Sequence, residues 1–270
     1  MTNPTQSTTP RWRLGAVSFL NAKPLIDGLD TDPTINLISD VPARLPGMLD
    51  EGRVDVALVP VIDLVRPDRQ WQIISDSCIG CDGETLTVRV FSRVAPERVR
   101  TLHVDGDSHT SVALARIIWR EVHGVDLTII PFRGTEGLAE CEAVLLIGDK
   151  VVNNTLLDYE IETDLGSCWK SLTSLPFVFA CWAGRRDLHG DVAGLARRLS
   201  RARDSGVAAA KMIAADLGPG LGWPVTLAER YLTARLKFTL GDRQREGLAR
   251  FLALAKRYDI VPAAQELVYA

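Results

Sequence analysis

The sequence predicts a mixed α/β protein with two lobes, a ligand cleft between them and a helical C-terminal region. Continuous apolar runs alternate with helical segments through the first two thirds of the chain, and purely helical patterns follow. Uninterrupted Val, Ile and Leu strands between helices are typical of sheets that are covered on both faces. The chain has 270 residues, of which 46% are hydrophobic and 24% charged. This composition provides material for one large core or two smaller ones.

Nine apolar runs are predicted to be strands. In chain order they cover residues 14–19, 35–39, 54–59, 71–75, 86–92, 102–105, 127–131, 143–147 and 176–183. Helices are predicted between them at residues 24–29, 43–51, 61–65 and 110–122. From about residue 192 to residue 258 only helical patterns occur. In residues 243–257, for example, apolar residues recur at the spacing that places them on one side of a helix. Gly218-Pro219-Gly220 and Trp223-Pro224 divide that region into separate helices.

This order of elements indicates two lobes rather than one long sheet. We expect a discontinuous first lobe from residues 13–93 and 183–270, and a second lobe from residues 94–182. The extended runs 85–93 and 176–183 would be the paired crossings between the lobes. Clefts between domains are favoured ligand sites because they can close and exclude water.

The ends and the charge of the chain exclude several classes of protein. Residues 1–12 are rich in Thr, Pro and Ser, and we expect a disordered tail there without the apolar core of a signal peptide. No apolar stretch is long enough to span a membrane, so the cytoplasm is the expected compartment. The net charge is −3, and no basic stripe is interleaved with aromatic residues. Nucleic acid is therefore not an expected partner.

Cysteine and histidine residues do not indicate a metal or a redox cofactor. The chain has five Cys and four His, so at least one thiol is unpaired. Cys78 and Cys81 have C-x-x-C spacing, but neither a second pair nor the strand-to-helix context of a redox site accompanies them. We expect no cofactor, no metal and a small molecule as the ligand.

Polar residues at two helix starts are the candidate ligand contacts. Ser18 and Asn21 follow an apolar strand just before Pro24, where the edge of an α/β sheet offers free backbone N–H groups to an anion or hydroxyl. Asn21 as a simple turn cap is the alternative. Ser108-His109-Thr110-Ser111 opens the clearest helix of the second lobe, and its hydroxyl and N–H groups suit a carboxylate. An ordinary Ser/Thr N-cap there is the alternative.

Five sequence blocks together resemble a known family. They are the blocks at residues 17–25 (VSFLNAKPL), 55–61 (DVALVPV), 108–114 (SHTSVAL), 146–149 (LIGD) and 175–180 (LPFVFA). In this order they resemble chorismate dehydratase, the first enzyme of the futalosine route to menaquinone. The resemblance covers almost everything from Arg13 to Tyr258. It implies a type II periplasmic-binding-protein fold used as an enzyme that converts chorismate to 3-[(1-carboxyvinyl)oxy]benzoate and water.

The resemblance also implies roles for particular residues. Asn21 matches the family asparagine at the substrate, where its amide would bind the departing hydroxyl. Thr87 stands where relatives often have serine, and it keeps the hydroxyl while adding a methyl group. Asp149 would orient a donor or act as a base, or would be only a turn residue. His109 is a second candidate base, and the substrate's own enolpyruvyl carboxylate is the third.

Three other functions share parts of this pattern. A solute-binding protein would have the same fold but should carry an export signal. The sister enzyme 1,4-dihydroxy-6-naphthoate synthase would have the same two lobes, but the block at residues 19–24 favours the dehydratase. A sensor lobe of a transcriptional regulator should be preceded by a helix-turn-helix segment, which the sequence before Arg13 does not contain.

Overall fold

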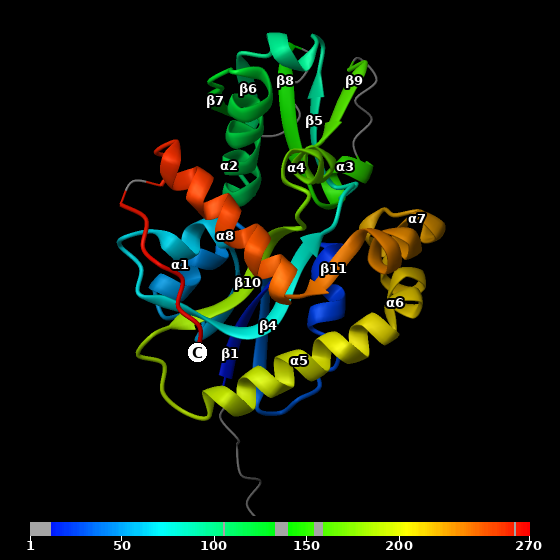
Figure 1. Ribbon diagram of the computed structural model, residues 1–270. Helices are drawn as coiled ribbons and strands as arrows, with labels where there is room; N and C mark the ends of the chain where they lie inside the picture. The colour runs from blue at the N-terminus through cyan, green and yellow to red at the C-terminus, as the bar shows by residue number, and fades with distance from the viewer. Residues whose placement is uncertain (1–11, 105, 133–139, 154–158, 262) are drawn as a thin grey trace, which may run out of the picture.

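The computed structural model describes residues 12–104, 106–132, 140–153, 159–261 and 263–270. Figure 1 shows two sheets, one above the other, with helices packed around each. The predicted tail lies outside the described residues except for Trp12, which is buried and begins the first strand. The end of the predicted strand 102–105 also lies outside them at residue 105.

The first sheet has six strands in the order β11-β4-β10-β3-β1-β2. Their bounds are β1 Trp12–Val17, β2 Ile35–Asp40, β3 Val56–Pro60, β4 Trp71–Cys81, β10 Phe177–Arg185 and β11 Leu236–Thr239. β1 pairs in parallel with β2 and β3, whereas β10 runs antiparallel between β3 and β4. A late segment of the chain therefore completes the middle of the first sheet.

The second sheet has five strands in the order β7-β6-β8-β5-β9. Their bounds are β5 Val88–Ser92, β6 Thr101–Val104, β7 Thr128–Pro131, β8 Ala143–Ile147 and β9 Ile161–Asp164. All five residues of β8 are buried, as are all five of β3 in the first sheet. Each central strand is thus covered on both faces, which explains its continuous apolar sequence.

Helices cover both sheets and fill the C-terminal region. In the first half of the chain they are η1 Leu20–Leu25, α1 Leu45–Asp50, η2 Val61–Val65, η3 Pro96–Arg98, α2 His109–Ile118 and η4 Trp119–His123. In the second half they are α3 Asp149–Asn153, α4 Leu165–Thr173, α5 Val192–Ala208, α6 Ala210–Leu217, η6 Pro219–Leu221, α7 Val225–Arg230, η7 Tyr231–Arg235 and α8 Asp242–Arg257. Figure 1 shows α5 crossing below the first sheet and α8 lying across its upper side toward α2.

The predicted mixed α/β architecture is confirmed, but the helix predicted at residues 24–29 is instead η1, and three further details were wrong. The region after residue 192 is not purely helical, because β11 joins the edge of the first sheet there. The strand 71–75 continues to Cys81, so Cys78 and Cys81 both lie in β4. β5 pairs with β8 and β9 of the second sheet, although the expected boundary at residue 93 assigned it to the first lobe.

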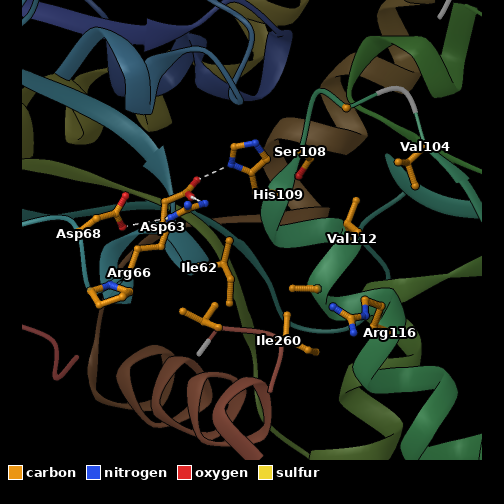
Figure 2. A pocket seen from close by; sticks show the side chains of 14 residues that line it. Ile62, Asp63, Arg66, Asp68, Val104, Ser108, His109, Val112, Arg116 and Ile260 are labelled. Atoms are coloured by element: carbon orange, nitrogen blue, oxygen red, sulfur yellow. Dashed lines mark hydrogen bonds and ion pairs between the residues drawn. The ribbon is translucent and has the colours of Figure 1, made fainter. Parts of the chain in front are cut away.

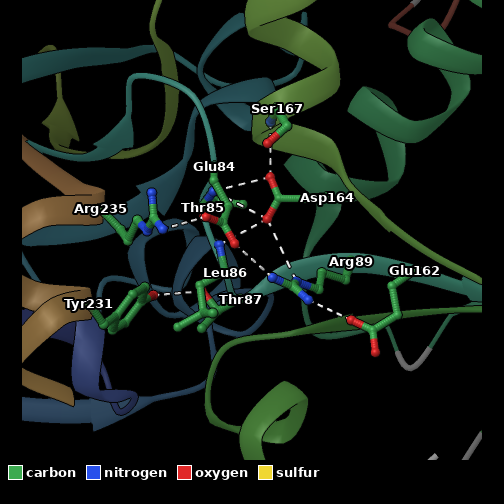
Figure 3. Close-up of polar contacts among 10 residues, drawn as sticks. All are labelled: Glu84, Thr85, Leu86, Thr87, Arg89, Glu162, Asp164, Ser167, Tyr231 and Arg235. Atoms are coloured by element: carbon green, nitrogen blue, oxygen red, sulfur yellow. Dashed lines mark hydrogen bonds and ion pairs between the residues drawn. The ribbon is translucent and has the colours of Figure 1, made fainter. Parts of the chain in front are cut away.

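Two chain crossings connect the sheets. The first runs from the end of β4 to β5 and contains Leu86, whose φ of +71° is unusual for a residue with a side chain. The carboxylate of Asp164 accepts hydrogen bonds from the backbone N–H groups of Thr85 at 3.1 Å and Leu86 at 2.9 Å. The same carboxylate caps α4 by accepting from Ser167 N–H at 2.9 Å, as Figure 3 shows. α4 then leads into β10, the second crossing, so one side chain ties both crossings together.

No helix in the described ranges is long and apolar enough to cross a membrane.

Candidate active site

A small cavity lies where the ends of several strands from both sheets meet. Its described polar lining consists of Asn21, Thr85, Thr87, Ser108, Ser111 and Tyr231. Apolar side chains, among them Phe19, Ile147 and Phe179, form the rest of the wall. The cavity volume is about 40 Å³, far below the roughly 300 Å³ or more of a typical ligand pocket. In this conformation the cavity is therefore smaller than a ligand of ordinary size.

Asn21 has an unsatisfied hydrogen-bond acceptor at this cavity. Its Oδ1 is buried and has no hydrogen-bond partner among the described residues. An acceptor left in this state costs roughly 1–3 kcal/mol, so a bound donor would relieve a cost that the empty protein carries. This property favours a ligand contact over the turn cap that the sequence left as the alternative, because a cap would occupy the oxygen.

The strand ends hold the site together through backbone contacts. Gly148, which follows β8, donates its backbone N–H to the Thr87 carbonyl at 2.8 Å. It has a φ of +59°, and a Cβ at this position would lie 2.5 Å from the Phe19 ring. Only glycine allows this close approach, which places Thr87 beside the segment that carries Asn21.

Asp149 connects this segment to the C-terminal region. Its Oδ1 accepts from the backbone N–H of Leu20 at 3.2 Å and from the indole Nε1 of Trp223 at 2.9 Å. Burial raises the pKa of Asp149, and the hydrogen bonds from Trp223 and Leu20 offset part of that effect. Asp149 does not line the small cavity. Its contacts match the orienting role considered from the sequence rather than that of a base.

The predicted carboxylate contacts at the start of α2 do not all face the small cavity. Ser108 is the N-cap, and its Oγ accepts from the backbone N–H of Ser111 at 3.2 Å and donates to the Ser111 hydroxyl at 2.9 Å. Both serines line the small cavity. Thr110 lies on another face of the helix, where its Oγ1 accepts from the backbone N–H of Ile62 at 3.4 Å. It therefore contacts the first sheet's side of the cleft and not the cavity.

His109 and Ser18 also lie away from the small cavity. Nδ1 of His109 is 2.7 Å from Oδ2 of Asp63, which is 1% exposed and also binds Arg69 at 2.8 Å. Figure 2 shows His109 pointing across the cleft to Asp63 of η2. Ser18 is half-buried after β1 and donates its backbone N–H to the Asp40 carbonyl at 3.0 Å.

A second, larger cavity of about 670 Å³ lies between α2, η2 and the segment after α8, as Figure 2 shows. Its wall combines apolar side chains with Arg66, Asp68, His109 and Arg116, and its buried carboxylate, Asp63, is paired with Arg66, Arg69 and His109. The orphaned amide oxygen lies at the small cavity instead. The small cavity is therefore the candidate site, and Ser108 lines both cavities.

Sequence analysis missed two aromatic residues of the site. Tyr231 is 1% exposed, and its hydroxyl lies 2.6 Å from Oγ1 of Thr87. Its ring stacks on Trp223, with the centroids 4.8 Å apart and the planes at 17°. Burial raises the pKa of Tyr231 well above its usual value, so the phenol keeps its proton. The Trp223-Pro224 break was visible in the sequence, but it was interpreted only as the end of a helix.

The cysteines lie apart from this site. Cys78 and Cys81 are buried in β4, and burial raises the pKa of both thiols, so they remain neutral. Within the residues that the structure describes, no group of three or more His, Cys, Asp and Glu side chains is arranged to hold a metal ion.

Sequence comparison relates the chain to a biosynthetic family. A family model for menaquinone biosynthesis matches residues 12–257. A chorismate dehydratase from Thermus thermophilus is 28% identical over 254 residues, which covers 88% of this chain and 93% of that protein.

Solved structures with the same fold include binding proteins. A crystal structure of an Archaeoglobus fulgidus protein has a TM-score of 0.72 at 13% identity and covers 94% of this chain and all of that one. The alkanesulfonate-binding protein of Xanthomonas axonopodis pv. citri has a TM-score of 0.70 at 12% identity, covering 94% and 95%. The periplasmic aliphatic sulphonate-binding protein of Escherichia coli has a TM-score of 0.63 at 13% identity and covers 94% of each chain. At these identities the likeness concerns the fold alone, which is that of the periplasmic binding proteins.

Proposed function

Because the chain belongs to the menaquinone biosynthesis family, we propose that it is a hydro-lyase that converts chorismate to 3-[(1-carboxyvinyl)oxy]benzoate. The observation that carries this proposal is the family match over residues 12–257, together with the chorismate dehydratase relative that aligns with 88% of the chain. The unsatisfied Asn21 oxygen at a cavity between the two sheets provides a place for the reaction. A small-molecule biosynthetic step of this kind fits the cytoplasm as compartment.

The net reaction removes one hydrogen from ring carbon C3 and the hydroxyl from C4. The C3–H pair becomes the new ring double bond, the C4–O bond breaks, and the proton and hydroxide leave together as water. Formation of the benzene ring makes this step strongly downhill, so the protein has to lower the barrier and not shift the equilibrium. It can do so by aligning the C–H and C–O bonds and by stabilising charge on the departing oxygen.

The residues at the cavity are suited to these two tasks. We assign the C4 hydroxyl to Asn21, whose Oδ1 accepts its proton in a hydrogen bond. We assign one substrate carboxylate to Ser108 and Ser111, because hydroxyl groups at the start of α2 also benefit from the positive end of the helix.

The substrate carboxylate is the base that this geometry favours. Among the described residues that line the small cavity, Tyr231 alone is titratable, and it stays protonated. Asp149 is occupied by Leu20 and Trp223, and His109 by Asp63. We therefore propose that the enolpyruvyl carboxylate removes the C3 proton and that this proton leaves with the C4 hydroxyl.

Closure of two lobes would exclude bulk water from the reaction. We propose that the lobes are built on the two sheets and move about the segments 82–87 and 174–176, where Leu86 and Ser174 both have positive φ. A cavity of about 40 Å³ fits a closed form that opens to admit substrate.

The test is direct incubation of the purified protein with chorismate. We expect the ring proton signals of chorismate to be replaced in NMR spectra by those of a 1,3-disubstituted benzene, at a rate proportional to protein concentration. The Asn21→Ala protein is the control for contaminating activity. Binding of chorismate without conversion would contradict the lyase and favour a solute-binding role. No binding, together with turnover of a later pathway compound, would favour the naphthoate synthase.

A further inference from the structure

We propose that Tyr231 is a positioning residue that fixes the direction of the hydrogen bond at Thr87. In this arrangement the cavity presents one acceptor, Asn21 Oδ1, and one donor, the Thr87 hydroxyl, to the same group of the substrate. The inference rests on the proposed dehydration and adds to it the means by which the departing hydroxyl is recognised.

The first step is the contact between Tyr231 and Thr87. Their oxygen atoms are 2.6 Å apart, and both side chains are 1% exposed. Figure 3 shows the tyrosine reaching from the C-terminal region to the crossing strand that carries Thr87. At this distance one of the two hydroxyl groups donates its proton to the other.

The second step assigns the donor. Asn21 lines the same cavity, and its Oδ1 accepts no hydrogen bond from any described residue. The Tyr231 proton is therefore not given to Asn21, and Thr87 Oγ1 is the acceptor within reach. The direction thus runs from Tyr231 O–H to Thr87 Oγ1.

The third step concerns the hydroxyl proton of Thr87 and the amide oxygen of Asn21. Thr87 has accepted the tyrosine proton, so its own proton is free to point into the cavity that it lines. Asn21 lines the same cavity, and its Oδ1 has no partner among the described residues. A substrate hydroxyl is the group that can satisfy both, because it donates one hydrogen bond and accepts others.

This arrangement acts on the bond that breaks. As the C4–O bond lengthens, negative charge grows on the oxygen, and the hydrogen bond from Thr87 strengthens. Tyr231 and Thr87 keep their protons throughout, and the proton that completes the water molecule is the one removed from C3. Tyr231 touches neither the hydroxyl nor C3 in this scheme, and it works by orienting Thr87, which contacts the departing hydroxyl.

Stacking on Trp223 allows Tyr231 to be tested by removal of one atom. Tyr231→Phe keeps the ring packed against Trp223 and removes only the hydroxyl. We expect kcat to fall about ten- to a hundredfold, less than loss of a direct donor costs, and KM to change by less than about threefold. Tyr159→Phe is the matched control, since the Tyr159 hydroxyl is also buried and bonded, to the Cys141 carbonyl in the second sheet's lobe. It should lower the melting temperature without changing kcat.

A double-mutant cycle separates positioning from general destabilisation. Thr87→Val removes the second link, and we expect the Thr87→Val/Tyr231→Phe double variant to be no slower than Thr87→Val alone. Thr87→Ser should restore most of the rate that Thr87→Val loses. Additive losses in the double variant, or a normal kcat for Tyr231→Phe, would overturn the proposal.

A readout that does not depend on turnover distinguishes this proposal from the proposed function. The γ-methyl signal of Thr87, assigned in ¹³C spectra by its loss in Thr87→Ser, should shift in Tyr231→Phe and not in Tyr159→Phe. If this signal shifts while the wild-type protein fails to convert chorismate, the hydrogen bond between Tyr231 and Thr87 stands and the reaction is different. If it does not shift, that hydrogen bond is absent whatever the enzyme does.

Discussion

At the scale of single residues, the site depends on one polar atom that has no partner. In the free protein the buried Oδ1 of Asn21 has no hydrogen-bond partner among the described residues, which is destabilising. Unsatisfied buried polar atoms are rare and occur mainly where a ligand supplies the missing partner. Its place shortly after β1 was predictable, because a short apolar strand ends in polar residues before Pro24. The contact between Thr87 and Tyr231, which lie 144 residues apart in sequence, is not contained in any local pattern.

Replacement of Asn21 should separate catalysis from stability. We expect Asn21→Ala to lose about a hundredfold in kcat, because the C4 hydroxyl loses the acceptor that orients it for departure. The melting temperature should be unchanged or higher, because the unsatisfied oxygen is removed. Asn36→Ala, at an exposed position of β2, is the control and should match wild type in both. A near-normal kcat in the folded variant would return Asn21 to the role of a turn residue.

The carboxyl group of Asp149 should affect the pH dependence of stability. Burial raises its pKa in the folded protein above the value of about 3.9 in an unfolded chain. Between these two values the folded state binds more protons, so the free energy of unfolding falls as the pH rises through this window and is level above it. Asp149→Asn cannot ionise and should lack this decline. Urea unfolding of both proteins from pH 4 to pH 8 measures the difference, and parallel curves would contradict the prediction.

At the scale of elements, the residue pattern decided which strands could be predicted. β8 was predicted with its observed bounds because all five of its residues are apolar and buried. β11 was missed because Lys237 and Thr239 face solvent and its four residues form an edge strand inside a helical region. η7, which begins with Tyr231, is a π-helical turn. Such turns are common at functional sites, but the extra residue that creates one is not visible in a helical pattern.

The start of α2 provides a test on neighbouring residues. Ser111→Ala should weaken chorismate binding about tenfold or more, as expected for loss of one hydrogen bond to a charged group. Thr110→Val should leave the affinity within about twofold and lower the melting temperature, since Ile62 N–H loses its acceptor. Calorimetric titration and thermal melts measure both effects. Equal losses of affinity in the two variants would mean that the substrate carboxylate lies elsewhere in the cleft.

At the scale of the whole molecule, contacts across the cleft hold the two lobes close together. His109 of α2 binds Asp63 of η2, and the backbone N–H of Ala43 donates to the Asp107 carbonyl at 3.1 Å. The two-lobe arrangement was predictable from the order of strands and helices. These contacts across the cleft were not predictable. Separation in sequence carries no information about the distance between residues of different lobes.

Removal of the His109 bridge should favour the open form. We expect His109→Ala to increase the radius of gyration of the free protein in small-angle X-ray scattering and to raise KM more than it lowers kcat, because part of the binding energy must then restore closure. His189→Ala, in an exposed loop, is the control. If the scattering curves of the two variants coincide, the bridge does not determine closure and His109 has another role.

The place of β10 in the middle of the first sheet has a consequence for synthesis on the ribosome. The second sheet draws its strands from one continuous stretch, β5 to β9, and can assemble once that stretch has left the exit tunnel. The first sheet must wait for β10 and β11, and the cavity must wait for Tyr231, which lies between these two strands in the chain. The later-numbered lobe is thus expected to fold first, while β1 to β4 remain exposed apolar strands in need of protection by chaperones. Chains released early, before residue 231, would contain a folded lobe and no active site.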